Sequence, residues 1–141
     1  MCMIDDADEH FQFYRESPKV ARKDHQCYEC QRVIHCGERY YYATAKSASS
    51  SIDQYHTCAH CHVAQEWLMA ECGGFLSGGV GEDIHDHWLE GGHGFGLARL
   101  DVGISRKWRR FDGVGLMALP KIPSLSARKQ SGVSAETFLA V

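Results

Sequence analysis

Residues 27–61 read CYECQRVIHCGERYYYATAKSASSSIDQYHTCAHC, a stretch that opens and closes with a pair of cysteines separated by two residues. The first pair is Cys27 and Cys30, and the second is Cys58 and Cys61. A C-x-x-C turn can present two thiolates to one metal ion at about 2.3 Å, and two such turns complete the tetrahedral shell that zinc prefers. The spacing therefore predicts one structural Zn²⁺ bound by these four cysteines.

Two other interpretations of the cysteines are weaker. Redox-active C-x-x-C motifs normally stand alone near a βαβ pattern, which this sequence lacks. His56, two residues before Cys58, could replace one cysteine as a ligand, but a complete four-cysteine shell needs no further donor. His60 lies between the last two cysteines and is expected to point outward. The remaining cysteines, Cys2, Cys36 and Cys72, lie outside the two C-x-x-C pairs.

The residues between and after the cysteine pairs predict a hairpin followed by a helix. Residues 39–45 are rich in tyrosine and favour a strand, residues 47–51 suit a turn, and residues 52–57 can return as a second strand. From the second cysteine pair onward, apolar residues recur every three or four positions until Gly73, where a left-handed residue ends helices. Knuckle, hairpin and helix in this order predict an α+β fold organised as a treble-clef-like zinc unit.

The flanking segments are less regular. One apolar stripe predicts a short helix over residues 82–90, and another, broken by Gly103, predicts a helix over residues 97–108. Residues 114–119 can form a strand, and Pro18 is expected to interrupt an extended segment near the N-terminus. The predicted organisation is an extended arm over residues 1–26, the zinc unit over 27–74, a helical segment packed on it over 75–119, and a loosely attached tail over 120–141.

Composition points to a soluble protein of the cytoplasm. The chain has 141 residues, of which 44% are hydrophobic and 23% charged, and it has no run of about 20 apolar residues such as a membrane helix needs. The N-terminus lacks the basic and apolar regions of a secretory signal. In a reducing compartment, thiols are more often metal ligands than disulfide partners, which agrees with the predicted zinc site.

Charge is distributed unevenly along the chain. The formal net charge is −3, made of −3 in residues 1–70, −5 in residues 71–95 and +5 in residues 96–141. The basic part contains the run Arg106, Lys107, Trp108, Arg109 and Arg110, which is the candidate partner-binding segment. Tyr, Trp and Arg are enriched at binding hot spots. Because no catalytic constellation is evident, the first hypothesis is a non-enzymatic module that binds another protein or a protein–nucleic-acid complex.

Two alternatives remain open. The same basic run could bind nucleic acid, with guanidinium groups on phosphates and Trp108 stacked on an unpaired base. The acidic composition argues against a dedicated nucleic-acid domain, and a solvated helix end explains the run as well. A metal-dependent nuclease of the HNH-like type would use histidines such as His35, His56 or His62, but no Asp-His pair lies within the predicted hairpin.

Several short motifs resemble those of small uncharacterised zinc proteins of bacterial phages and prophages. The resemblance rests on the two cysteine pairs, on Gly37-Glu38-Arg39-Tyr40 between them, and on Cys72-Gly73-Gly74-Phe75 and the basic run after them, and it covers roughly residues 20–112. It implies a phage accessory protein acting in the host cytoplasm, a class that often inhibits host defence complexes such as CRISPR effectors. The family has no established activity, so the resemblance implies no mechanism.

Overall fold

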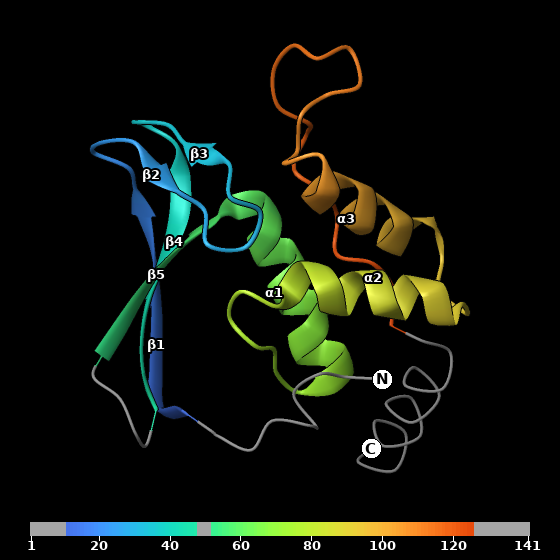
Figure 1. Ribbon diagram of the computed structural model, residues 1–141, viewed down its shortest axis with the longest axis horizontal. Coiled ribbons are helices and arrows are strands. Elements are labelled where there is room, and N and C mark those ends of the chain that lie inside the picture. Colours follow the sequence, from blue (N-terminus) through green and yellow to red (C-terminus); the bar gives the residue numbers. More distant parts are fainter. Residues whose placement is uncertain (1–10, 48–51, 126–141) are drawn as a thin grey trace, which may run out of the picture.

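The computed structural model describes residues 11–47 and 52–125 (Figure 1). The acidic N-terminal run with Cys2, most of the predicted turn at 47–51 and the tail beyond residue 125 lie outside these ranges. The elements are β1 (Phe11–Val20), β2 (His25–Gln26), β3 (Val33–Ile34), β4 (Arg39–Ser47), β5 (Ile52–Cys58), α1 (Ala59–Cys72), α2 (Val80–Glu90) and α3 (Phe95–Ser105). This is a small mixed α+β fold with antiparallel sheets and three helices among the described residues, in agreement with the predicted class.

The larger sheet has the order β1-β4-β5, and all its pairs are antiparallel. The predicted hairpin is confirmed, with Tyr40 opposite Cys58 and Ala43 opposite Tyr55. The expected interruption at Pro18 is wrong, because β1 continues through it and pairs Pro18 with Tyr41. Proline lacks an N–H donor but is tolerated in an edge strand, and β1 is at the edge. Part of the predicted N-terminal arm is thus a strand of this sheet.

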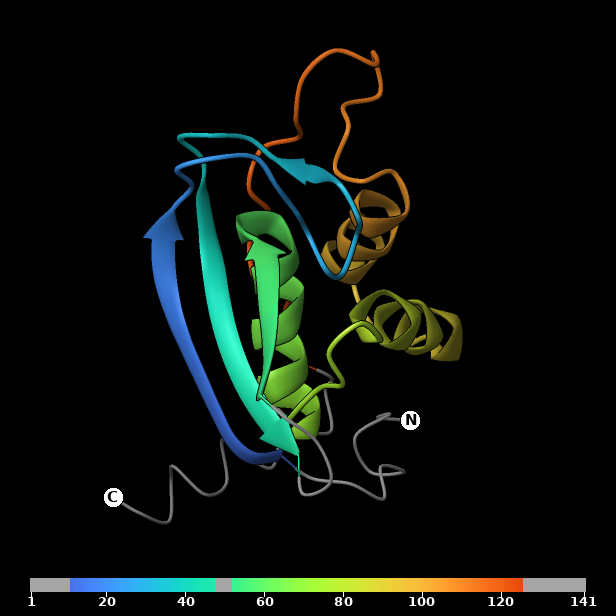
Figure 2. The same ribbon diagram turned by 60° about the vertical axis from the view of Figure 1, so that its left-hand side comes forward.

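Helix α1 covers one face of this sheet. The predicted helix is confirmed, and it ends at Gly73, whose φ of 80° is left-handed and whose N–H donates to the Met69 carbonyl. Trp67 and Leu68 are fully buried on α1. The ring of His62 on α1 stacks on Tyr41 of β4 at 3.5 Å between centroids. In Figure 2, the described helices lie on this side of the sheet.

Helix α2 packs beside α1, and α3 packs beside α2. Together they complete the core through Ile84, Leu97 and Leu100, all fully buried. Helix α3 ends at Ser105 and not at Trp108, because Lys107 and Trp108 adopt left-handed φ angles of 55° and 61° that turn the chain back. Within residues 11–47 and 52–125, no helix is long and apolar enough to cross a membrane.

The segment after α3 differs from the expectation. Residues 114–119 do not form a strand, and the described part of this segment has one isolated bridge, between Arg109 and Leu116. Residues 120–125, expected to begin a loose tail, contact the body of the protein. Pro120 is buried, and the Trp67 indole N–H donates to the Ser124 carbonyl at 3.3 Å.

Candidate metal centre and adjoining surface

The first cysteine pair lies on a tight turn between β2 and β3. The Cys27 N–H donates to the Arg32 carbonyl at 2.8 Å, and the Gln31 N–H donates to the Cys27 carbonyl at 2.9 Å. Closing the turn requires a φ of 69° at Gln31, which is left-handed and unusual outside glycine. The Gln31 side chain stabilises the turn by donating to the Tyr28 carbonyl. The short β2–β3 sheet therefore aims both sulfurs at one point.

The second pair lies where β5 becomes α1. Cys58 is the N-cap residue of α1, and its sulfur accepts the Cys61 backbone N–H at 3.4 Å. Free N–H groups and the positive end of the helix dipole stabilise thiolates at such a position. The predicted placement of these two residues at a helix start is confirmed.

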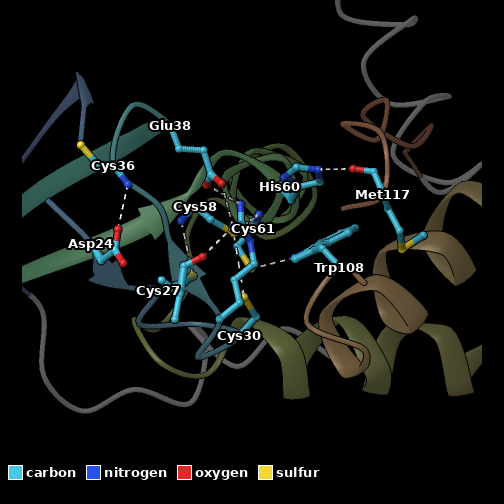
Figure 3. A network of polar contacts seen from close by, with 12 residues as sticks. Asp24, Cys27, Cys30, Cys36, Glu38, Cys58, His60, Cys61, Trp108 and Met117 are labelled. Atoms are coloured by element: carbon cyan, nitrogen blue, oxygen red, sulfur yellow. Dashed lines mark hydrogen bonds and ion pairs between the residues drawn. The ribbon is translucent and has the colours of Figure 1, made fainter. Parts of the chain in front are cut away.

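The four sulfurs form a cluster of the size of a zinc site (Figure 3). All four ligand atoms lie within 4.8 Å of one another, and the Cys30 and Cys58 sulfurs are 3.9 Å apart. A tetrahedron with metal–sulfur bonds of 2.3 Å has edges of about 3.8 Å. All four residues are buried. The residues present therefore fit a thiolate-bound metal ion such as zinc.

Electrostatics inside the cluster also fits a cation. Contacts with Cys30, Cys58 and Cys61 lower the pKa of the Cys27 thiol well below its usual range. Contacts with Cys27 and Cys58 raise the pKa of Cys30, and contacts with Cys27, Cys30 and Cys58 raise that of Cys61. Without a cation, the sulfurs must share protons because neighbouring thiolates repel one another. A divalent ion would allow all four to be thiolates.

Hydrogen bonds to the sulfurs connect the cluster to the rest of the fold. The Cys58 N–H donates to the Cys27 sulfur at 3.4 Å. The Trp108 indole N–H donates to the Cys61 sulfur at 3.3 Å, from a side chain that is 0% exposed. Trp108 therefore contacts the cysteine cluster, and its expected place on a binding surface is wrong.

His60 also ties the cluster to the C-terminal segment. It was expected to point outward, but it is buried, and its Nε2 lies 2.7 Å from the Met117 carbonyl. Burial lowers the pKa of His60, which favours a neutral ring that donates from Nε2. Its ring centroid lies 5.2 Å from that of Trp108. Together, His60 and Trp108 fix both ends of residues 108–117 (Figure 3).

Glu29, between the first two cysteines, makes a third connection. Its carboxylate accepts the backbone N–H groups of Gly78 and Val80 at 3.0 Å and 3.3 Å. It also accepts a hydrogen bond from the Gln65 side chain. Because the N–H groups at the start of α2 have no intrahelical acceptor, Glu29 acts as a cap supplied by the turn that carries Cys27 and Cys30.

His56 is outside the cluster, which among the described residues consists of the four cysteines alone. Its ring stacks on His25 at 4.3 Å between centroids. His62, also considered for a nuclease site, has its two ring nitrogens 2.8 Å and 3.3 Å from the carboxylates of Glu16 and Glu66. These histidines thus make contacts that hold the fold together.

The basic run divides into interior and exposed members. Arg106 donates to the carbonyls of Arg109 and Arg110 and lies over the Phe111 ring, so its guanidinium closes the turn. Lys107, Arg109 and Arg110 are exposed. The structure adds two apolar residues that the sequence reasoning missed, Phe111 at 74% and Val114 at 71% exposure. They flank Asp112-Gly113, a dipeptide typical of hairpin turns. This dipeptide could have predicted an exposed turn at these residues.

A groove separates the turn around Asp112-Gly113 from the turn that carries Cys27 and Cys30. Its volume is about 480 Å³, and its walls include Gln31, Val33 and His35 on one side and Lys107, Arg109 and Leu116 on the other. We call the exposed residues Lys107, Arg109, Arg110, Phe111 and Val114 the 107–114 surface. The groove brings this surface next to the residues that hold the first cysteine pair.

Comparison with family models, curated proteins and solved structures finds no match to this chain.

Proposed function

We propose that this chain is a non-enzymatic, zinc-stabilised interaction protein that binds a protein partner through the 107–114 surface. The observation that carries the proposal is the hydrogen bond from Trp108 to the Cys61 sulfur. It links the proposed metal ligands to the base of an exposed turn that carries two apolar side chains and three cations.

The zinc ion is proposed to be structural. A catalytic zinc keeps one coordination position open for water or substrate, whereas four cysteines complete the shell. The burial of all four residues supports a closed site. In this proposal, knuckle, hairpin and helix form a treble-clef-like unit, and the metal holds its two ligand pairs together.

The 107–114 surface has the composition of a binding site. Exposed aromatic and arginine side chains are enriched at hot spots, and an apolar centre with a charged rim is the common arrangement. Phe111 and Val114 supply apolar area, and Lys107, Arg109 and Arg110 lie beside them, with Arg110 paired to Asp112 at 3.1 Å. A partner with an apolar patch beside acidic residues would complement this surface.

The resemblance to phage zinc proteins suggests where the partner is found. We propose that the chain acts in a bacterial host cell and that the partner is a component of a host defence complex, for example a CRISPR effector. This proposal assigns no catalytic group to the chain. The chain would therefore inhibit or modulate the host complex by occupying a surface on it.

Affinity capture from bacterial lysate with quantitative mass spectrometry tests the proposal. The wild-type protein should retain a host complex, and the variant Phe111→Ser/Val114→Ser should lose most of it. Loss of a hot spot worth 2 kcal/mol or more corresponds to about a 30-fold weaker complex.

A matched control removes the same kind of area elsewhere. Leu89→Ser/Phe95→Ser changes two exposed apolar residues on or next to α2 and α3 and should leave capture unchanged. Equal capture by wild type and the Phe111/Val114 variant would contradict the assigned surface, and capture of no protein above background would contradict the interaction itself.

A further inference from the structure

The face of the large sheet opposite α1 carries positive charge from strands that the 107–114 surface does not include. In an antiparallel sheet, directly paired residues project from the same face, and side chains alternate along each strand. Glu16 contacts His62 of α1, and Tyr41 stacks on that same ring, so their face is the one that α1 covers. The alternate residues, including Arg15, Lys19 and Tyr42, project from the opposite face.

Register shows that the described strand residues place no acidic side chain on this second face. Arg15 pairs with Thr44, Lys19 with Tyr40, and Lys46 with Ile52, which places three cations on it. The alternate positions between Arg15 and Lys19, Tyr40 and Lys46, and Ile52 and Cys58 contain no Asp or Glu. The acids of these strand segments, Glu16 and Asp53, pair with Ala43 and Ala45 on the side of α1.

A depression continues the positive charge at one end of the face. It has a volume of about 750 Å³ and is lined by Lys19, Val20, Arg22, Lys23, His25 and Tyr40. Asp24, the acid within this stretch, is not part of the lining and accepts the Cys36 backbone N–H at 2.9 Å. We call Arg15, Lys19, Arg22, Lys23 and Lys46 the basic face.

Aromatic and imidazole rings lie among these cations. The Lys19 ammonium lies 4.5 Å from the centroid of the half-buried Tyr42 ring. The rings of His25 and His56 stack at 4.3 Å and are both half-buried. A phosphate held by Lys19 would therefore bring its base close to flat side chains on which bases can stack. Figure 2 shows no described helix over this side of the sheet.

We propose that the basic face binds single-stranded nucleic acid, with Arg and Lys side chains on phosphates and Tyr42 stacked on a base. An acidic peptide could match the charge, but it offers no bases to the rings. A free phosphate would use one or two of the cations, whereas Arg15 and Lys19 are four residues apart on one strand, about 13 Å. This binding goes beyond the proposed protein partner and uses different residues.

Fluorescence anisotropy with a labelled 12-nucleotide oligo(dT) or oligo(U) and the full-length zinc-loaded protein tests the proposal. With four to five phosphates neutralised, the slope of log K against log salt concentration should be about −3. Arg22→Gln/Lys23→Gln should weaken binding about tenfold at low salt and reduce the magnitude of the slope by about 1.4. Tyr42→Leu should weaken binding about tenfold with the slope unchanged.

Controls make each outcome decisive. Arg99→Gln/Lys121→Gln removes two charges outside both surfaces and should bind as wild type, and circular dichroism and zinc content verify that each variant is folded. Absence of binding at low salt would overturn the proposal. Unchanged oligonucleotide binding by the Arg22/Lys23 variant, or loss of binding in Arg109→Gln/Arg110→Gln instead, would also overturn it. Tighter binding of a 12-base-pair duplex than of the single strand would do the same, as would polyglutamate that competes as well as an unlabelled oligonucleotide.

Discussion

Residues 11–72 and residues 80–125 hold their shapes by different means. The first region has a three-stranded sheet, a covering helix and four cysteines from two positions that meet at one point. The second region has two short helices and an exposed turn, and it is fixed to the first by Glu29, His60 and Trp108. We therefore expect the second region to depend on the turns that carry the cysteines more strongly than the first region depends on the second.

Removal of the metal should have the largest effect on this arrangement. Structural zinc supplies about 10–16 kcal/mol of apparent free energy in small zinc domains. Addition of a chelator, or the substitution Cys61→Ser, should therefore abolish the cooperative unfolding transition of both regions. Circular dichroism during thermal melting measures this transition. Metal analysis should find one zinc ion per wild-type chain. Cys36→Ser changes an exposed cysteine outside the cluster and should melt as wild type. An unchanged thermal midpoint after chelation would refute the metal-centred fold.

Substitution of Trp108 should have the next largest effect, and this effect should differ between the two regions. Trp108→Ala removes a fully buried ring and should cost about 3–5 kcal/mol in urea unfolding. Gly103→Ala should be comparably harmful, because a Cβ there would lie 2.1 Å from the Trp108 ring. Gly94→Ala, which meets nothing within 4 Å, is the matched control. Hydrogen exchange should show protection lost in α3 and the following turn, with the sheet retained; equal loss in the sheet would contradict the proposed direction of dependence.

Glu29 tests the connection to α2. Glu29→Ala leaves the N–H groups of Gly78 and Val80 without their acceptor and should cost about 1–3 kcal/mol. Exchange of amide hydrogens at the start of α2 should accelerate, while the zinc content stays at one per chain. Glu82→Ala, an exposed acid in the first turn of the same helix, should cost less. Equal effects of the two variants would mean that the cap contributes only charge.

The features that the sequence predicted are those governed by short-range spacing. Both cysteine pairs, the hairpin between them and the helix that ends at Gly73 follow from ligand spacing and from residue periods of two and about four. Such patterns need no knowledge of distant segments. The α+β class and the cysteine cluster could therefore be predicted, and the zinc identity remains a prediction that metal analysis tests.

The features that the sequence did not predict depend on contacts between distant residues. Trp108 lies in a run of cations, which suggests exposure to solvent, yet its side chain is buried. It donates to the sulfur of Cys61, which lies 47 positions earlier in the sequence. His60 similarly finds its acceptor 57 positions later, at Met117. The basic face can be recognised only from the register of β1 on β4, because Glu16 lies between Arg15 and Lys19 along the chain but projects from the other face of the sheet.

The smallest predicted effect concerns Glu16, which connects the edge strand to α1. The hydrogen bond from His62 lowers the pKa of Glu16 below its usual value of 4.5. A lowered folded-state pKa stabilises the fold above pH 4.5, and this contribution is lost as pH falls through the folded-state value. Glu16→Gln should therefore lower stability at pH 7 by less than ~1 kcal/mol, since the pair is partly exposed. The difference in melting temperature from wild type should shrink on acidification of zinc-saturated samples, and Glu82→Gln should show no such trend. A difference that grows toward pH 4 would mean that the hydrogen bond between His62 and Glu16 does not hold β1 against α1.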